Sequence, residues 1–203
     1  MRAIYFDLDG TLLQFDEGDV VDAMTAAFEA VAGEARDEWL EAYNAGFLER
    51  FEACEPAPYR GGVERARAEA GFDGGVEETA AALLDAEIEL LEPSPGAGET
   101  LAELGEAYRV GVLTNGAPEF QRAKLAAHGL HEHVDCVVAS YEAGAHKPDL
   151  APFELAERRL PADAYALVGD ADADVDGAAN AGWDALRYGG GELGDVPGDL
   201  GWA

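Results

Sequence analysis

The sequence predicts an α/β protein, in which a three-layer core built on a parallel sheet carries a second, all-helical domain as an insertion. Three observations lead to this prediction. Short apolar runs without alternation recur along the chain, helical stretches separate most of them, and one long interval contains helical patterning alone. Uninterrupted apolar runs suit strands that are buried on both faces. Strands that alternate with helices indicate a parallel sheet, and right-handed crossovers place the carboxyl ends of its strands at one edge.

The core domain is expected to comprise residues 1–14 and 93–203. Its strands are predicted at residues 3–6, 110–113, 134–139 and 165–168, with a weaker one at 185–188. Its helices are predicted at residues 97–107, 119–128, 152–159 and 175–181. The tail after Tyr188 is rich in Gly and Asp and is predicted to be irregular.

The inserted domain is expected at residues 15–92, after the first strand. Its helices are predicted at residues 20–31, 37–51, 62–70 and 76–91, with Pro and Gly breakers between some of them. Aromatic residues recur near helical spacing within this interval, which indicates a packed core for the insert. Residues 93–96 form the expected return to the core domain.

The chain of 203 residues carries 42 acidic and 13 basic residues, a formal net charge of −29. Such a surface repels phosphate backbones and anionic lipid headgroups, so we expect neither a nucleic-acid nor a membrane partner. The acids are spread along the chain, which indicates a solvated surface adapted to high salt. Recruitment of cations or of a basic partner is the alternative interpretation.

The N-terminal segment and the cysteines bear on location. The start, MRAIYFDLDGT, reaches charged residues too soon for a signal peptide, and no apolar run approaches the roughly 18 residues of a membrane span. The two cysteines, Cys54 and Cys136, make neither a disulfide framework nor a CxxC pair. We therefore expect a cytoplasmic protein.

The strongest chemical signal is Asp7-Leu8-Asp9-Gly10-Thr11, which directly follows the first predicted strand. Two carboxylates two residues apart, at a strand end that opens into a glycine turn, can both aim at one ligand. One carboxylate can serve as a nucleophile and its neighbour as a general acid and base, and their negative charge favours a bound cation. The alternative is an ordinary Asp-Gly turn.

A second acidic cluster, Gly169-Asp170-Ala171-Asp172-Ala173-Asp174-Val175-Asp176-Gly177, follows the strand predicted at 165–168. Asp172, Asp174 and Asp176 match the first half of an EF-hand loop. The twelfth position of that loop is Trp183 instead of Glu, and the flanking helices are missing, so we reject the EF-hand. We interpret Asp170 as a ligand of a hard cation and Asp174 as a group that holds a metal-bound water. Asp172 and Asp176 are interpreted as surface acids or helix N-terminal charges.

Two further motifs place polar groups after predicted strands. Thr114 and Asn115 offer hydrogen bonds to an anion, although a helix N-cap and turn would use the same residue types. Lys147, one of two lysines in the chain, would neutralise a bound phosphoryl group if it lies near the carboxylates; the alternative is a surface residue. All four motifs are expected at strand carboxyl ends, and thus on the edge where parallel sheets bind ligands.

The order DxDGT, Thr-Asn-Gly, Lys-Pro-Asp and GDxxxD resembles the haloacid dehalogenase (HAD) superfamily, over the chain from Ala3 to about Tyr188. The predicted core resembles its Rossmann-like sheet, and the helical insert resembles the type-1 cap of its subfamily I. The resemblance implies that Asp7 is the nucleophile, which forms an aspartyl-phosphate. It also implies that Asp9 protonates the leaving alcohol and later activates water.

The same resemblance implies a phosphate-binding set. Thr114 and Asn115 would hold phosphoryl oxygens, and Lys147 would stabilise the charge on Asp7 and on the phosphoryl group. This assignment agrees with the physical demands of phosphoryl transfer, which mostly needs positioning and charge neutralisation.

The resemblance further implies a Mg²⁺ ion as cofactor. Mg²⁺ would sit between the Asp7 carboxylate, the Asp9 carbonyl and Asp170, with Asp174 in the outer sphere. An oxygen-rich site of this kind suits Mg²⁺ with retained waters.

The residues discriminate among the chemistries of this superfamily. Dehalogenases that resemble it lack the second acid of the first motif because a halide leaving group needs no protonation, so Asp9 argues for a phosphate ester. Phosphonate-cleaving members need a cap lysine, and residues 15–92 contain none. We therefore expect Mg²⁺-dependent hydrolysis of a small organic phosphate monoester, with a phosphorylated metabolite as partner. A phosphomutase of the same superfamily and a non-catalytic module that binds Mg²⁺ or phosphate are the alternatives.

The cap is expected to select the substrate. Gln14 at its entrance, and Tyr59 and Arg60 in a Pro- and Gly-rich segment, are candidate substrate contacts. Arg60 would read a carboxylate or a second phosphate, and its alternative is a surface pair with nearby glutamates. Phosphoglycolate, sugar phosphates and nucleoside monophosphates are the ester classes considered, and a monomer or a homodimer is expected.

Overall fold

The computed structural model describes residues 1–15 and 18–202. The chain divides into two compact units, one formed by Met1–Gln14 with Glu92–Ala203 and the other by Phe15–Leu91. The second boundary lies one residue before the expected one. The reason is that β3 (Glu92–Pro93) pairs antiparallel with β2 (Leu13–Gln14), which makes Glu92 part of the first unit.

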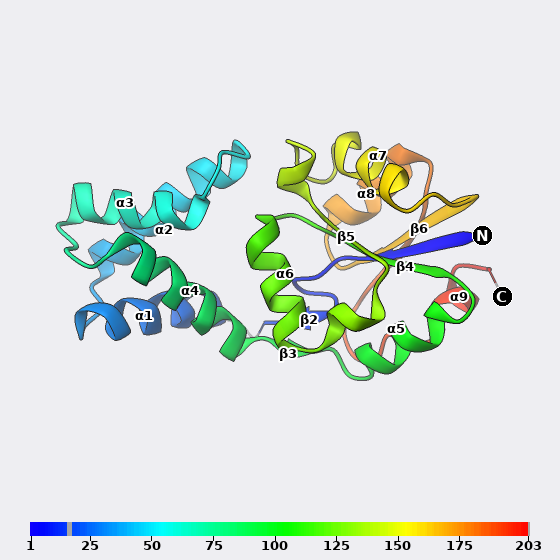
Figure 1. Cartoon of the computed structure of the whole chain (residues 1–203), viewed down its shortest axis with the longest axis horizontal. Helices are drawn as coiled ribbons and strands as arrows, with labels where there is room; N and C mark the ends of the chain where they lie inside the picture. Colours follow the sequence, from blue (N-terminus) through cyan, green and yellow to red (C-terminus); the bar gives the residue numbers. More distant parts are fainter. Residues whose placement is uncertain (16–17, 203) are drawn as a thin grey trace. The chain divides into compact units, whose positions relative to one another are not determined.

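The first unit is built on a five-stranded parallel sheet (Figure 1). Its strands are β1 (Arg2–Phe6), β4 (Arg109–Thr114), β5 (Cys136–Ala139), β6 (Ala164–Gly169) and β7 (Asp184–Arg187). They lie in the order β5-β4-β1-β6-β7, and every neighbouring pair is parallel. After β1, the next two strands of this sheet, β4 and β5, lie on one side of β1, and the last two, β6 and β7, lie on the other side. The direction in which strands are added therefore reverses beside β1. Open α/β sheets bind ligands at such a reversal.

Helices cover both faces of this sheet (Figure 1). The helices α7 (Leu150–Arg159) and α8 (Asp172–Ala181) lie on one face, and α5 (Ala97–Gly105) and α6 (Pro118–Ala127) lie on the other. Tyr5 packs with Phe153 beneath α7, and its hydroxyl donates to the carbonyl oxygen of Ala156 at 2.9 Å. Ile4 and Phe6 alternate with Tyr5 toward the opposite face and are fully buried as well. Burial on both faces explains why β1 is apolar without alternation.

The tail after β7 departs from the prediction of irregular structure. A short helix, α9 (Val196–Asp199), forms there. Asp195 caps it, since its side chain accepts a hydrogen bond from the N–H of Gly198 at 3.0 Å.

The second unit consists, in its described part, of four helices. They are α1 (Asp19–Ala32), α2 (Asp37–Glu52), α3 (Pro58–Ala70) and α4 (Val76–Leu90). The helix α3 begins four residues before its predicted start because Pro58 occupies the first turn, where a missing N–H costs nothing. Gly61, one of the expected breakers, lies inside α3, as does Gly62, the predicted first residue of this helix. A Cβ on Gly62 would lie 2.5 Å from the Tyr43 ring, so this glycine allows α3 to pack closely on α2.

Aromatic rings form the core of the second unit, as their spacing predicted. Phe28 is fully buried, and its ring centroid lies 6.2 Å from that of Trp39, 5.9 Å from that of Tyr43 and 4.7 Å from that of Phe72. Rings at such distances add to the hydrophobic stabilisation of a core.

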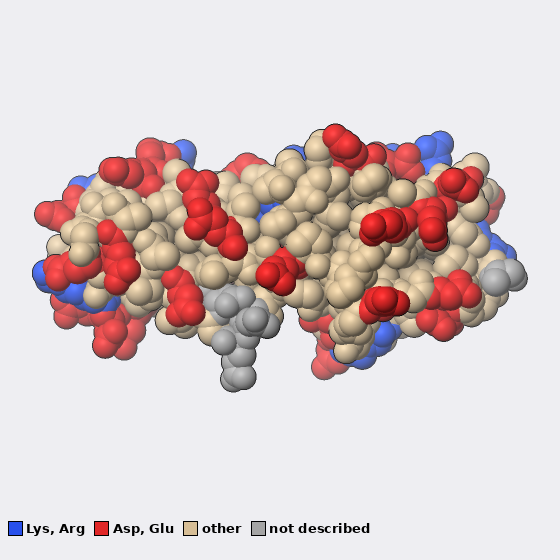
Figure 2. All heavy atoms as spheres, turned by 90° about the horizontal axis from the view of Figure 1, so that it is seen from below, with Lys and Arg blue, Asp and Glu red and all other residues tan. Residues whose placement is uncertain are grey.

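Carboxylates are distributed over the visible face of both units, whereas Lys and Arg form small separate groups there (Figure 2). This distribution agrees with acids that are spread along the sequence. In the part of the chain that the structure describes, no helix has the length and apolar character needed to cross a membrane.

Candidate active site

Three neighbouring strand ends bring the acidic motifs and the Thr-Asn motif together. Asp7 directly follows β1, Thr114 is the last residue of β4, and Asp170 directly follows β6. The N–H of Asp7 donates to the carbonyl oxygen of Val168 at 2.8 Å, which continues the β1–β6 pairing past the end of β1. Asp7 is 7% exposed, so its carboxyl group lies largely out of contact with water.

A loop, rather than a strand end, carries Lys147 to these groups. The strand β5 ends at Ala139, and the 3₁₀ helix η2 (Ser140–Glu142) and the residues after it return the chain to the sheet edge. The Ser140 hydroxyl fastens this loop beside β4, since it accepts a hydrogen bond from the N–H of Gly116 at 3.0 Å. Lys147 therefore reaches the expected edge of the sheet, but from the loop that follows β5 instead of from a strand end.

Lys147 is buried between two carboxylates. Its Nζ donates to Asp7 Oδ1 at 2.7 Å, to Asp174 Oδ1 at 2.5 Å and to the carbonyl oxygen of Leu113 at 2.8 Å. The Lys147 side chain is 2% exposed. All three of its N–H bonds therefore have acceptors, as a buried ammonium group requires.

The carboxylates around Lys147 carry more charge than this lysine balances. The pKa of Asp7 is raised to about 7: burial is the largest cause, Lys147 opposes the rise, and the charges of Asp174 and Asp9 add to it. Burial alone would lower the pKa of Lys147, but the attraction of Asp7 and Asp174 outweighs burial and raises it. A further positive charge at this point would therefore stabilise the ionised form of Asp7.

The donor set around Asp7 fits a divalent cation. Asp7, Asp170 and Asp174 each offer a carboxylate oxygen, and these atoms all lie within 4.8 Å of one another. Two glycines allow this approach. Gly10 has φ 90°, and a Cβ on it would lie 2.6 Å from Asp170 Oδ2; a Cβ on Gly169 would lie 2.3 Å from Asp174 Cγ. Clustered hard oxygen donors with surplus negative charge suit Mg²⁺.

The two acids from the second cluster differ in how they are held. Asp174 is 1% exposed, and its Oδ2 accepts a hydrogen bond from the N–H of Ala171 at 3.0 Å while its Oδ1 contacts Lys147. Asp170 is exposed, and its Oδ1 accepts a hydrogen bond from the Thr11 hydroxyl at 3.2 Å. Asp170 is therefore the more accessible ligand, whereas both oxygens of Asp174 already have protein donors.

Asp9 turns toward α6, where it meets two residues to which the sequence analysis assigned no role. Its Oδ1 accepts a hydrogen bond from Lys124 Nζ at 3.1 Å, and its Oδ2 accepts one from Gln121 Nε2 at 2.6 Å. Gln121 also donates to Thr114 Oγ1 at 2.7 Å. Two signals in the sequence point to these residues. Lys124 is the other lysine besides Lys147 in this chain, and Gln121 stands three residues before it on the helix that follows Thr114.

Asn115 fastens the loop that bears Lys147. Its side-chain nitrogen donates to the carbonyl oxygen of Lys147 at 3.2 Å, and its Oδ1 accepts a hydrogen bond from the N–H of Lys147 at 2.8 Å. Thr114 is 1% exposed, with its hydroxyl at the same sheet edge. Contact of Thr114 and Asn115 with phosphoryl oxygens stays a prediction.

Comparison with known protein families supports the family that the order of the motifs indicated. The family model of the haloacid dehalogenase-like hydrolases matches residues 1–182. The chain belongs to this family. As a haloacid dehalogenase-like hydrolase it has the α/β core with a helical insertion that the sequence predicted.

Similar proteins in this family carry out more than one reaction. The glyceraldehyde 3-phosphate phosphatase of Methanothermobacter thermautotrophicus is 40% identical over 101 residues, 48% of this chain and 45% of that protein. The ribulose-1,5-bisphosphate 5-phosphatase of Halopiger xanaduensis is 30% identical over 92% of this chain and 84% of that protein. The structure of a 2-haloacid dehalogenase from Pseudomonas syringae pv. Tomato DC3000 is similar with a TM-score of 0.73 and 25% identity, over 97% of this chain and 91% of that one.

The three candidate substrate contacts have partners within their own units. Gln14 Nε2 donates to Ser94 Oγ at 2.9 Å and to the carbonyl oxygen of Thr11 at 3.1 Å. These bonds stabilise the region where β2 pairs with β3. The Tyr59 hydroxyl donates to Glu87 at 3.2 Å in the helical unit, where Arg60 forms an ion pair at 2.6 Å. The partner of Arg60 is Glu77, which agrees with the alternative prediction that Arg60 forms a surface pair with a nearby glutamate. A substrate role for these three residues stays a prediction.

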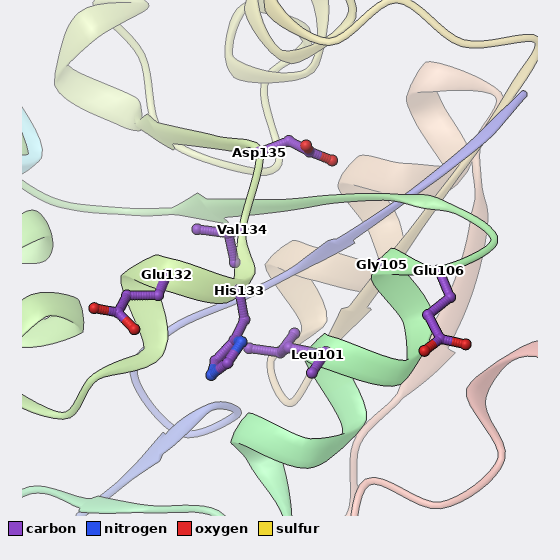
Figure 3. Close-up of a pocket in the computed structure, with 8 residues that line it drawn as sticks. Leu101, Gly105, Glu106, Glu132, His133, Val134 and Asp135 are labelled. Atoms are coloured by element: carbon purple, nitrogen blue, oxygen red, sulfur yellow. The ribbon is translucent and has the colours of Figure 1, made fainter.

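A hollow of about 400 Å³ lies at the opposite edge of the sheet, where β5 begins (Figure 3). Glu106, Glu132 and Asp135 are among the residues that line it, and Figure 3 shows their carboxylates pointing away from one another. Asp135 already accepts a hydrogen bond from the N–H of Val110 at 3.1 Å. Because these acids do not converge, the hollow lacks the donor arrangement found around Asp7.

Proposed function

We propose that this haloacid dehalogenase-like hydrolase is a Mg²⁺-dependent phosphatase that cleaves a small organic phosphate monoester through an aspartyl-phosphate. The observation that carries the proposal is the place of Asp9. Its carboxylate shares the Gln121 side chain with Thr114, a candidate phosphate contact. A proton-transfer group beside the phosphate serves an alcohol leaving group and would be superfluous for a halide.

The reaction proceeds in two balanced steps. The Asp7 carboxylate attacks phosphorus, the bond from phosphorus to the leaving oxygen breaks, and that oxygen takes a proton from Asp9. A water molecule then attacks the aspartyl-phosphate and gives a proton to Asp9, and cleavage of the bond from phosphorus to Asp7 restores the carboxylate. Lys147 holds Asp7 in place throughout and balances part of its charge.

Mg²⁺ is proposed as the cofactor because the donors suit it. Asp7, Asp170 and the Asp9 carbonyl would hold the ion, with Asp174 in the outer sphere, where Lys147 and the N–H of Ala171 already orient it. When bound, the ion would neutralise charge between the carboxylates and the phosphoryl group.

The relatives support the ester class in general terms, since two that match this chain are named as phosphatases of phosphorylated sugars. We propose a small phosphorylated metabolite as the substrate, the cytoplasm as the place of action and a monomer or homodimer as the active form. The net charge of −29 supports the absence of nucleic-acid and membrane partners, because it repels both phosphate backbones and anionic headgroups.

The test is release of phosphate from a panel containing p-nitrophenyl phosphate, phosphoglycolate, glyceraldehyde 3-phosphate and nucleoside monophosphates, with 2-chloropropionate as the dehalogenase substrate. We expect release in Mg²⁺ and KCl that EDTA abolishes. Asp7→Asn should abolish release, and Asp9→Asn should lower it by about 100-fold or more. Asp176→Asn changes an exposed acid on the same helix as Asp174 and should leave the rate unchanged.

Other results on this panel would overturn the proposal. Release of chloride without release of phosphate would assign dehalogenation. Transfer of phosphate between positions of a sugar, with little free phosphate, would assign a mutase. Binding of Mg²⁺ with no turnover of any ester would leave a binding module.

A further inference from the structure

We infer that Lys124 and Gln121 are positioning residues that hold the Asp9 carboxylate in the orientation needed for proton transfer. This inference rests on the proposed function, in which Asp9 gives its proton to the leaving oxygen. Both residues belong to α6 and lie outside the four motifs that predicted the site. They therefore extend the candidate catalytic machinery to a helix that carries none of the four motifs.

The geometry of the contacts carries the inference. Lys124 Nζ lies 3.1 Å from Asp9 Oδ1, and Gln121 Nε2 lies 2.6 Å from Asp9 Oδ2. One hydrogen bond leaves a carboxylate free to rotate about it, whereas donors on both oxygens define the plane of the group. The spacing of three residues puts Lys124 and Gln121 on the same face of α6, so one rigid element presents both donors.

Gln121 also links Asp9 to the phosphate side of the site. The same Nε2 atom lies 2.7 Å from Thr114 Oγ1, and Gln121 is 2% exposed. The position of Asp9 is thereby tied to that of Thr114. A displacement of about 1 Å at a reacting group can cost a factor of about 100 in rate, so such a link matters for catalysis.

Folding of the first motif does not explain why Lys124 is there. The turn after Asp9 is made by the backbone, since the N–H of Gly10 donates to the carbonyl oxygen of Leu13 at 2.7 Å. The Asp9 side chain is 29% exposed and reaches water, whereas the Lys124 side chain is 5% exposed. Burial of an ammonium group is costly, and an ion pair with a part-exposed partner adds little to stability.

The use of lysine in this chain agrees with a chemical role. Lys124 and Lys147 are the two lysines among 13 basic residues, and all others are arginines. Both are buried, and each contacts one carboxylate of the first motif. The ammonium group of lysine is a compact point charge, whereas the guanidinium of arginine is a rigid planar fork, so the two residues are not interchangeable at such a contact.

A leaving-group series distinguishes positioning from a structural role. Protonation by Asp9 matters most when the leaving oxygen is strongly basic, as in phenyl phosphate, and least for 2,4-dinitrophenyl phosphate. We expect Lys124→Met to lower kcat/KM for phenyl phosphate by about tenfold or more, and for 2,4-dinitrophenyl phosphate by less than about twofold. A structural defect would lower both values by the same factor.

Matched variants complete the experiment. Lys124→Arg retains the charge and a donor, so its kcat/KM for phenyl phosphate should lie closer to that of the wild-type enzyme. Gln121→Met removes the second donor and should give a loss with the same leaving-group dependence. Arg122→Met removes a cation from the exposed side of α6 and should change neither value by more than about twofold. Circular dichroism in KCl verifies that each variant is folded.

The outcomes separate the two proposals. If the wild-type enzyme hydrolyses the esters and Asp9→Asn loses activity toward phenyl phosphate, the proposed function stands. An equal loss for both esters in Lys124→Met and Gln121→Met, or no loss in either variant, would then overturn the inference alone. If the wild-type enzyme hydrolyses no ester, the proposed function and the inference both fail.

Discussion

Replacement of Lys147 by methionine should destabilise the metal-free protein strongly. Methionine occupies a similar volume but removes the ammonium group that now lies 2.7 Å from Asp7 Oδ1 and 2.5 Å from Asp174 Oδ1. The two carboxylate side chains are 10% and 2% exposed, so water replaces little of the lost interaction. The variant therefore leaves two buried carboxylates facing each other without a cation.

The size of this effect follows from the burial of the pair. Loss of one partner of a buried ion pair costs about 3–5 kcal/mol. For a chain of this length, that free energy corresponds to a midpoint lower by about 6–20 °C. Asp7 relieves part of the cost by taking up a proton, because Lys147 is the group that now lowers its pKa. The loss should thus be smaller at pH 6 than at pH 8.

A double-mutant cycle provides the assay. Urea and thermal unfolding of the wild-type protein, Lys147→Met, Asp174→Asn and the double variant are measured in KCl with EDTA. The double variant should be more stable than Lys147→Met by about 1–3 kcal/mol because it removes one of the two stranded charges. A loss of less than about 1 kcal/mol in Lys147→Met, or strict additivity in the cycle, would refute the reasoning.

Three further predictions concern pH, packing and salt. Burial alone would raise the pKa of Glu142, but hydrogen bonds from Arg159, Arg122 and a backbone N–H lower it from the usual 4.5 to about 2. A depressed folded-state pKa stabilises the fold above pH 4.5 and loses this effect as the pH falls toward 2. Urea unfolding at fixed KCl should therefore show that the wild-type protein is more stable than Glu142→Gln by about 1–2 kcal/mol at pH 7, since water and salt screen these partly exposed pairs, and by less at pH 3. Equal differences at the two pH values would contradict the assignment. Gly169→Ala should lower kcat/KM for p-nitrophenyl phosphate by about tenfold or more, because the added methyl group would collide with the Asp174 side chain. Gly189→Ala is the control: in the described part of the chain, no atom beyond its immediate neighbours lies within 4 Å of the position of its added methyl group, so its kcat/KM should equal that of the wild type. With a net charge of −29, the far-UV circular dichroism should lose its native signal as KCl is removed, and full folding without salt would count against salt adaptation.

Much of the core could be predicted because its signals are local. The strand β1 is buried on both faces, so its apolar run stands out in the sequence without any knowledge of its neighbours. Because the motif that begins at Asp7 directly follows that apolar run, it could be assigned to the end of a strand. The start of helix α3 was predicted less well, because Pro58 and Gly61 have the local character of helix breakers. The helix tolerates Pro58 because it lies in the first turn, and Gly61 because it packs against Arg50 of α2.

The side-chain partners in the site could not be predicted in the same way. The sequence predicted a phosphate contact for Asn115, but it did not predict that the Asn115 amide spans the backbone of Lys147. The four motifs gave Lys124 no role, although it contacts Asp9 across a separation of 115 residues. Such contacts depend on how a loop or helix lies against the sheet, and no local pattern records that placement.

The sequence by itself determined the residue types at the strand ends, and with them the family, the acidic character of the site and its suitability for a hard cation. These follow from apolar runs and from motifs that are contiguous in the chain. The motif resemblance also implied that Lys147 acts on Asp7, and the structure confirms this contact. Only the tertiary structure decided that the same ammonium group meets Asp174 and that Lys124 and Gln121 meet Asp9. The physical reason is that a buried charge takes its partner from whatever the fold packs against it, and that packing joins residues more than 100 positions apart.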